Sequence, residues 1–125
     1  MSRNQQRLVD YLEHILIAIQ RIDGYVSDIT EITFLHNSLI QDAVIRNIEI
    51  IGEASNKVQT HYSDFAEEHA DLPFSQAYQM RNAVAHGYFK VDMDILWKTI
   101  QSDLPDLYSR VNVAYQALKS RLEET

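Results

Sequence analysis

The sequence contains no cysteine, only three glycines and only two prolines. Without cysteine the chain can form neither a disulfide bond nor a thiolate metal site, and it has no cysteine nucleophile. This composition fits a reducing compartment, so we expect a cytoplasmic protein. Sandwiches and barrels need turn residues every ~8–12 positions, and the few glycines and prolines cannot supply them. The scarcity of turn residues therefore predicts an all-α fold with short connections.

Long apolar runs and a surplus of basic residues are also missing. No stretch approaches the ~20 apolar residues that cross a bilayer, and the N-terminal segment has no signal-peptide core, so we expect no membrane contact. The net charge is −7, and residues 26–70 hold eight acidic but only two basic side chains. Nucleic-acid binders usually display a basic face. Any contact with RNA must therefore rest on a few local cations or on a site shared between subunits.

What is present indicates one globular domain over residues 1–125. The hydrophobic fraction of 46% and the charged fraction of 23% are ordinary globular values, and single domains cluster at ~100–150 residues. Apolar residues recur every three or four positions, which is the spacing of one buried helix face. The pattern predicts an up-and-down bundle of four to five helices. The expected helices cover about residues 4–23, 37–62, 73–86, 93–103 and 105–123.

Several positions bear on where these helices begin and end. Gly24 is expected to close the first helix, because glycine tolerates the left-handed conformation common at that position. Gly52 lies inside the second helix, where glycine costs ~1 kcal/mol relative to alanine, and close approach of another helix would explain its presence. Pro105 is expected to start or kink the last helix. Residues 29–34 are interpreted as a loop or helix start, and residues 61–72 as a connection with one turn.

The most distinctive stretch covers residues 81–88 and reads RNAVAHGY. It places a permanent cation, an amide, an imidazole and a phenol at an expected helix end. The guanidinium of Arg81 is a planar donor fork suited to phosphate, and His86 can titrate near neutral pH. Together they can move a proton and stabilise charge on a phosphoryl group without a metal. The alternative, without a catalytic role, is a surface ion pair beside a histidine whose position at the helix C-terminus the helix dipole favours.

The spacing within this stretch constrains its geometry. Asn82 and His86 are four residues apart and share a helix face. Arg81 and His86 are five apart, roughly 140° around a straight helix. Both could reach one phosphate in three ways. The arginine could reach around the helix, the helix could break at Gly87, or two copies of the chain could complete the site.

Residues 81–88 match the Arg-x4-His-x-Tyr pattern of the HEPN superfamily, and the chain more narrowly resembles the HepT-like ribonuclease toxins. The resemblance extends to residues 41–54, QDAVIRNIEIIGEA, which look like that family's second-helix signature. Residues 91–92 and 96–97, VD and LW, resemble the family's residues on the C-terminal side of the motif. The resemblance covers nearly the full chain.

The resemblance implies an all-α homodimer that cuts RNA, expected to be tRNA or mRNA, in a cleft between protomers without a metal or other cofactor. Arg81 would hold and neutralise the scissile phosphate. His86 would act as general acid/base in the attack by the neighbouring 2′-hydroxyl, and Asn82 would orient His86 or the phosphate. The resemblance also implies a type VII toxin–antitoxin pair. In such a pair a nucleotidyltransferase antitoxin of the MntA type transfers AMP to the motif tyrosine, here Tyr88, and silences the nuclease.

Other polar residues of the second expected helix stay open to two interpretations. Arg46, Glu49 and Glu53 form either a solvated face or a surface that docks the antitoxin or lines the cleft. Glu49 and Glu53 are a like-charge pair one turn apart, which is unfavourable unless a cation lies between them. Asn47 lies within the apolar stripe and is interpreted as a hydrogen-bonded core amide. The remaining histidines have no metal-site spacing, so no metal site is predicted.

The alternative to a nuclease is a non-catalytic helical adaptor. It would bind a nucleotidyltransferase or a nucleotide through the surface of Arg81 and Tyr88, and the acidic net charge favours it slightly.

Overall fold

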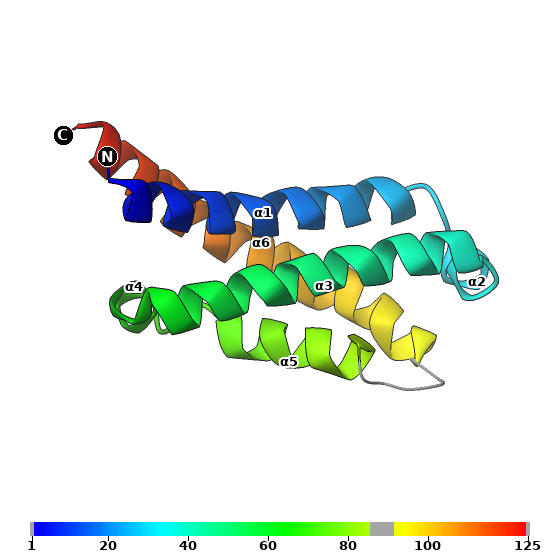
Figure 1. Cartoon of the computed structure of the whole chain (residues 1–125). Helices are drawn as coiled ribbons and strands as arrows, with labels where there is room; N and C mark the ends of the chain where they lie inside the picture. Colours follow the sequence, from blue (N-terminus) through cyan, green and yellow to red (C-terminus); the bar gives the residue numbers. More distant parts are fainter. Residues whose placement is uncertain (1, 86–91, 125) are drawn as a thin grey trace.

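Helices account for all the regular secondary structure in the part of the chain that the computed structural model describes, residues 2–85 and 92–124 (Figure 1). The predicted all-α class is therefore confirmed for these residues. Four long helices alternate in direction along the bundle, and two short ones lie at its ends. The helices are α1 (Arg3–Val26), α2 (Glu31–Leu35), α3 (Ser38–His61), α4 (Ser63–Glu68), α5 (Phe74–Ala85) and α6 (Met93–Glu123).

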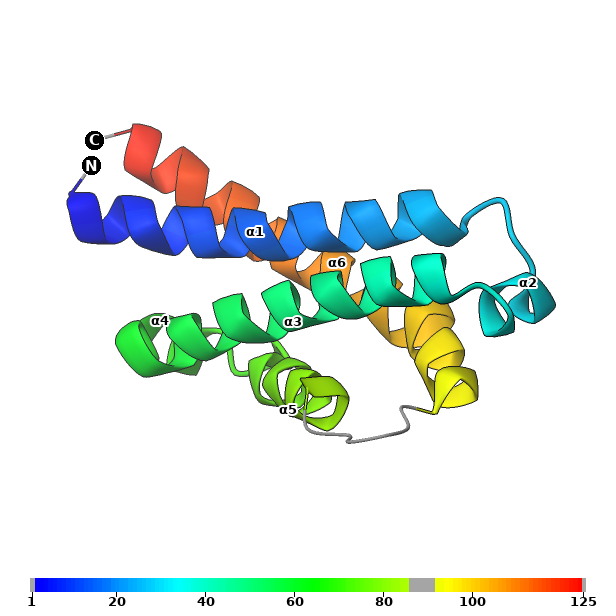
Figure 2. The ribbon, with the colours of Figure 1, turned by 45° about the vertical axis from the view of Figure 1, so that its right-hand side comes forward.

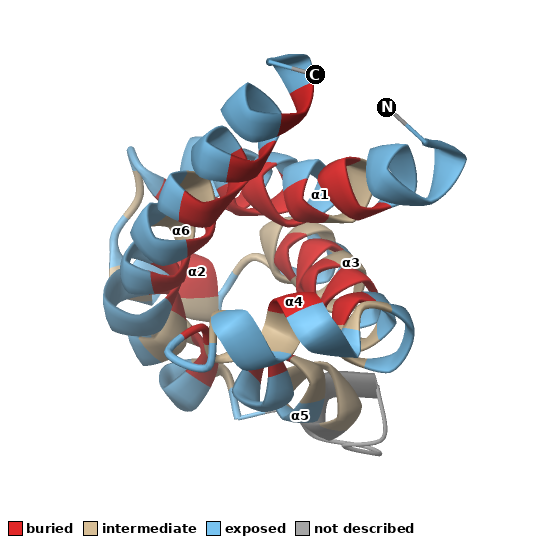
Figure 3. Ribbon diagram, turned by 90° about the vertical axis from the view of Figure 1, so that its left-hand side faces the viewer, coloured by how far each residue is buried: buried red, intermediate tan, exposed pale blue. Residues whose placement is uncertain are grey.

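The core lies where the apolar stripes of α1, α3 and α6 face one another. Figure 3 shows the buried residues turned towards the interior of the bundle and the exposed ones on its outside. The stripes predicted for residues 4–23 and 37–62 are confirmed, with only Ile40 partly exposed. The largest fully buried side chains of α1 and α3 are Leu12, Ile15, Ile22, Val44, Ile48, Ile51, Ser55 and Val58.

Two predicted boundaries are wrong. Helix α1 does not end at Gly24 but continues to Val26, which is buried, and its C-cap residue Ser27 has an ordinary right-handed conformation (φ −61°, ψ −31°). Since the chain needs no left-handed residue there, Gly24 is simply helical. Likewise α6 is one helix with Pro105 inside it, not two helices. A proline inside a helix costs ~3 kcal/mol, but the buried Leu104 and Leu107 keep one apolar face continuous across it.

The two short helices occupy segments whose structure the sequence left open. Helix α2 begins at Thr30, whose hydroxyl accepts a hydrogen bond from the Thr33 amide, and it buries Phe34 completely. The Phe34 ring packs on Trp97 of α6 with 5.3 Å between ring centroids. Helix α4 is the single turn expected between residues 61 and 72. With these two additions the described chain has six helices, more than the four to five predicted.

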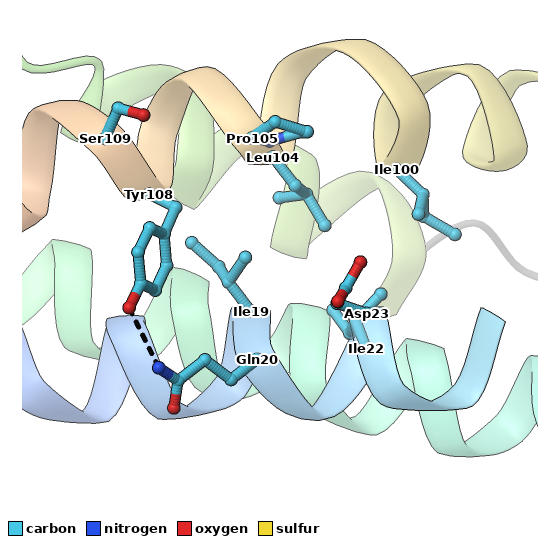
Figure 4. Close-up of a pocket in the computed structure, with 9 residues that line it drawn as sticks. All are labelled: Ile19, Gln20, Ile22, Asp23, Ile100, Leu104, Pro105, Tyr108 and Ser109. Atoms are coloured by element: carbon cyan, nitrogen blue, oxygen red, sulfur yellow. Dashed lines mark hydrogen bonds between the residues drawn. The ribbon is translucent and has the colours of Figure 1, made fainter. Parts of the chain in front are cut away.

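Two polar contacts join α1 to α6. The Tyr108 hydroxyl accepts a hydrogen bond from Gln20 Nε2 at 2.8 Å, beside a cavity of about 370 Å³ between the two helices (Figure 4). The Tyr115 hydroxyl donates to Glu13 at 2.8 Å. This hydrogen bond, together with burial, raises the pKa of Tyr115 to about 12. The phenol therefore stays protonated, and keeps donating to Glu13, to a higher pH than an ordinary tyrosine would.

Helices α3 and α5 approach each other most closely at Gly52. A Cβ atom at this position would overlap the Cβ of Arg81 and would lie 3.3 Å from the Ala77 carbonyl oxygen. The overlap is with an atom next to the backbone, so a flexible side-chain end could not relieve it. The expectation that another helix approaches Gly52 is therefore confirmed.

We predict opposite effects for alanine at the two helical glycines. In Gly52→Ala the added methyl group pushes α5 away from α3. Such overpacking costs ~1–3 kcal/mol, and the gain in helix propensity of ~1 kcal/mol offsets only part of that. Gly24→Ala is the matched control, because a Cβ there would meet nothing within 4 Å. Urea denaturation should show a lower free energy of unfolding for the first variant and a value higher by up to about 1 kcal/mol for the second. Equal shifts would contradict the close crossing.

Candidate functional site

Arg81 lies on α5 at the crossing with α3, where the missing side chain of Gly52 leaves room for it. Its guanidinium is held on two sides. Nη2 donates to Glu53 Oε1 at 2.8 Å, and Nη1 donates to Asn82 Oδ1 at 3.1 Å. The Arg81 side chain is 24% exposed, whereas that of Glu53 is 55% exposed. The guanidinium is therefore fixed in direction but still reaches solvent.

The held guanidinium keeps donors to spare. A guanidinium carries five N–H donors, and the described residues accept from only two of them. The Nε atom of Arg81 is buried and has no partner among these residues. The Nη1 and Nη2 atoms each keep one further N–H, and a phosphate oxygen is a strong acceptor for such donors. Arg81 can therefore bind a phosphate without giving up the contacts that position it.

The structure brings together two of the four predicted site residues. Arg81 and Asn82 are neighbours in the chain, and the side-chain amide oxygen of Asn82 accepts a hydrogen bond from the Arg81 guanidinium. His86 and Tyr88 lie outside the described residues, although α5 carries the chain to Ala85 immediately before them. The meeting of Arg81 with His86 at one phosphate stays a prediction.

Glu53 is the site residue for which the sequence left two interpretations. The structure places its carboxylate against the guanidinium of Arg81. The carboxylate of Glu49, one turn earlier, lies 3.6 Å from Nη1 of Arg46. Each carboxylate of the like-charge pair thus has its own cation, one from α3 and one from α5. The signal in the sequence was the adjacent Gly52, which marks the place where another helix comes close. Asn47 is buried and donates to the Ala43 carbonyl, as predicted for a core amide.

Two other kinds of site are absent from residues 2–85 and 92–124. No three acidic or histidine side chains gather there in a way that could hold a metal ion. None of the helices is long and apolar enough to cross a membrane.

The described residues thus form a helical domain in which a partly exposed arginine is held in direction and keeps N–H donors that none of these residues uses. The family described as Ribonuclease HepT-like matches residues 15–114 of the chain. The chain therefore belongs to the HepT-like ribonuclease family.

Several relatives are similar to this chain over most of its length. "Probable ribonuclease HepT" of Thermococcus cleftensis is 42% identical over 98 residues, which is 78% of this chain and 86% of the relative. "Gamma-glutamylcyclotransferase and putative RNase MJ0434" of Methanocaldococcus jannaschii is 38% identical over 81% of this chain, which spans only 44% of that protein. "Putative RNase MJ1380" of the same organism is 34% identical over 82% of this chain and 92% of its own length. No solved structure matches significantly.

Proposed function

We propose that the protein is a metal-independent endoribonuclease with Arg81 and His86 as its catalytic residues and Asn82 as a positioning residue. The observation that carries the proposal is the guanidinium of Arg81, which Glu53 and Asn82 hold while the described residues accept from only two of its five donors. This guanidinium begins the Arg-x4-His-x-Tyr segment of a chain that belongs to the HepT-like ribonuclease family.

The chemistry is an attack of the ribose 2′-oxygen on the adjacent phosphorus. The new P–O bond forms a 2′,3′-cyclic phosphate, and the bond to the 5′-oxygen of the next nucleotide breaks. His86 removes the proton from the 2′-hydroxyl or supplies one to the leaving 5′-oxygen. Arg81 donates to the phosphoryl oxygens, where negative charge grows in the transition state. Because the guanidinium is held in advance, little reorganisation is needed when the charge develops.

We propose that the active form is a homodimer, so that two copies of Arg81 and His86 line one cleft. Two such arginines and two such histidines would gather the local cations that a chain with a net charge of −7 needs to bind RNA. Exposed apolar side chains support such an assembly. Ile32, Leu39 and Ile95 are 72%, 79% and 61% exposed. They belong to α2 and to the first turns of α3 and α6, which lie at the same end of the bundle (Figures 1 and 2). Exposed apolar groups gathered in one region are typical of interfaces.

We further propose that a nucleotidyltransferase antitoxin of the MntA type silences the nuclease in the cytoplasm by AMP transfer to Tyr88. The phenol oxygen would attack the α-phosphorus of ATP, pyrophosphate would leave, and the phenol proton would pass to solvent. The position of the tyrosine two residues after His86 supports this role. The added phosphate would repel RNA from the cleft by its charge and its bulk.

The first prediction from the proposed function concerns the catalytic pair, Arg81 and His86. Purified protein should cleave tRNA in the presence of EDTA, and His86→Ala should lower the rate about 100-fold or more because general acid/base catalysis is lost. Arg81→Lys should also cleave slowly, since an ammonium keeps the charge but loses the planar fork. His61→Ala is the matched control, as this exposed histidine closes α3. Fragment analysis on gels measures the rates.

Two outcomes would count against this function. Cleavage by His86→Ala at the wild-type rate would remove the acid/base role. A folded wild-type protein that leaves tRNA intact but binds a nucleotidyltransferase would support the helical adaptor instead.

The second prediction concerns Glu53 as the anchor of Arg81. Glu53→Ala should lower kcat up to about fivefold, because a partly exposed ion pair contributes ~0.2–1 kcal/mol. Glu53→Gln should keep most of the activity, since an amide oxygen can accept the same hydrogen bond. Glu49→Ala controls for the loss of a carboxylate from α3. Tighter RNA binding by Glu53→Ala at unchanged kcat would show that Glu53 competes with phosphate rather than positioning Arg81.

The third prediction concerns Tyr88. Co-expression with a neighbouring nucleotidyltransferase should increase the protein mass in AMP steps that map to Tyr88. Tyr88→Phe keeps the ring but lacks the acceptor oxygen, so it should gain no mass and should stay active beside the partner. Intact-mass and peptide mass spectrometry measure the change. AMP on another residue in the wild-type protein would contradict the assignment.

A further inference from the structure

A groove runs between α1 and α3 on the surface of the bundle. It consists of two adjoining hollows of about 290 and 240 Å³ that share His14 and Ile50 in their walls. We call it the α1–α3 groove. Its polar lining is His14, Arg21, Arg46, Asn47, Glu53 and Lys57.

The groove collects cations in an acidic part of the molecule. Residues 26–70 contain only two basic side chains, Arg46 and Lys57, and both line the groove opposite Arg21 of α1. Within residues 2–85 and 92–124, neither Arg21 nor Lys57 forms an ion pair. Arg46 forms a salt bridge with Glu49 at 3.6 Å, but the Arg46 side chain is 69% exposed, and such a surface ion pair contributes little to stability. Arg21 and Lys57 are therefore available to an anionic ligand, and Arg46 can exchange its weak ion pair for one.

The groove also leads to Arg81. Glu53 lines the second hollow and is the carboxylate that holds the guanidinium of Arg81. Residues 47 and 57 both line the groove and are ten residues apart on α3, which corresponds to about 15 Å at the rise of an α-helix. An extended polyanion that lies along this length would pass Glu53 and so come near the proposed cleavage site.

Other lining groups suit a nucleic acid better than an acidic protein. The Tyr11 ring borders the groove and stands edge-on to His14, with 6.2 Å between ring centroids. Bases of single strands stack on such aromatic side chains. Asn47 is only 4% exposed, and its Oδ1 atom accepts no hydrogen bond from the described residues.

We propose that the α1–α3 groove binds the stretch of single-stranded RNA adjacent to the scissile phosphate, an inference that rests on the proposed ribonuclease function. Arg21, Arg46 and Lys57 bind the phosphates, and Tyr11 stacks on a base. This arrangement explains how a chain with a net charge of −7 can hold a polyanion.

The test compares two double variants that each remove two positive charges. Arg21→Gln/Lys57→Gln changes the groove. Arg3→Gln/Arg121→Gln is the matched control, because both arginines are exposed and lie near the two chain termini (Figure 2). The ligand is a fluorescent 2′-O-methyl oligoribonucleotide, which lacks the nucleophilic hydroxyl and cannot be cut by the proposed reaction. Anisotropy titrations at several salt concentrations give the dissociation constant and its salt dependence, and circular dichroism verifies the fold.

The groove variant should bind about tenfold more weakly or worse, and its salt slope should fall by about 1.4, since each lost phosphate contact on a single strand contributes ~0.7. The control variant should bind within twofold of the wild type. Equal weakening in both variants would overturn the proposal, because the effect would then be one of net charge alone. Unchanged RNA binding would overturn it as well.

Two further measurements separate the alternatives. Sedimentation of both variants shows whether the groove is instead covered by a second copy; loss of the wild-type assembly in the groove variant alone would overturn the RNA assignment. Cleavage assays separate this proposal from the proposed function. If the protein cuts no RNA but its RNA binding depends on the groove residues, the nuclease proposal is rejected and the groove proposal stands. If it cuts RNA but its binding does not depend on the groove residues, the groove proposal is rejected and the nuclease proposal stands.

Discussion

The crossing of α3 and α5 at Gly52 is the constraint on which the site depends. Because position 52 has no side chain, the stem of Arg81 lies directly against α3. The next residue of α3, Glu53, then comes within 2.8 Å of the guanidinium. A bulkier residue at the crossing would separate the helices and move the arginine from the carboxylate that fixes its direction. Glycine inside a helix lowers the stability of that helix, but at position 52 it allows Arg81, the functional cation, to take its place beside Glu53.

The charge of the chain acquires a different meaning once the helices are packed. The net charge of −7, summed over the whole chain, argues against a partner as acidic as RNA. In the folded protein, however, Glu53 pairs with Arg81 and Glu49 lies beside Arg46. The field near a site depends on which charges face it and which are compensated, because screening in water weakens distant charges. A chain that is acidic overall can therefore present a locally basic groove. The α1–α3 groove, proposed to bind RNA, is linked in this way to the proposed cleavage site.

The apolar stripes were predictable from the sequence because one helix face repeats every 3.6 residues, and the buried residues of α1 and α3 follow that period. The two wrong boundaries came from local signals that packing overrides. Gly24 permits a helix end but does not require one, and α1 continues to the buried Val26. Pro105 disfavours a helix by its missing donor, yet the apolar face on both of its sides is buried against the core.

The all-α class, the approximate positions of α1, α3 and α5 and the order of Arg81, Asn82, His86 and Tyr88 in one segment could be read from the sequence alone, because each depends on residues close together in the chain. The pairing of Arg81 with Glu53, 28 residues away, could not. Nor could the assembly of cations from α1 and α3 along one groove. Such contacts depend on how the helices are rotated and how closely they approach, and only the packing of the whole core determines both.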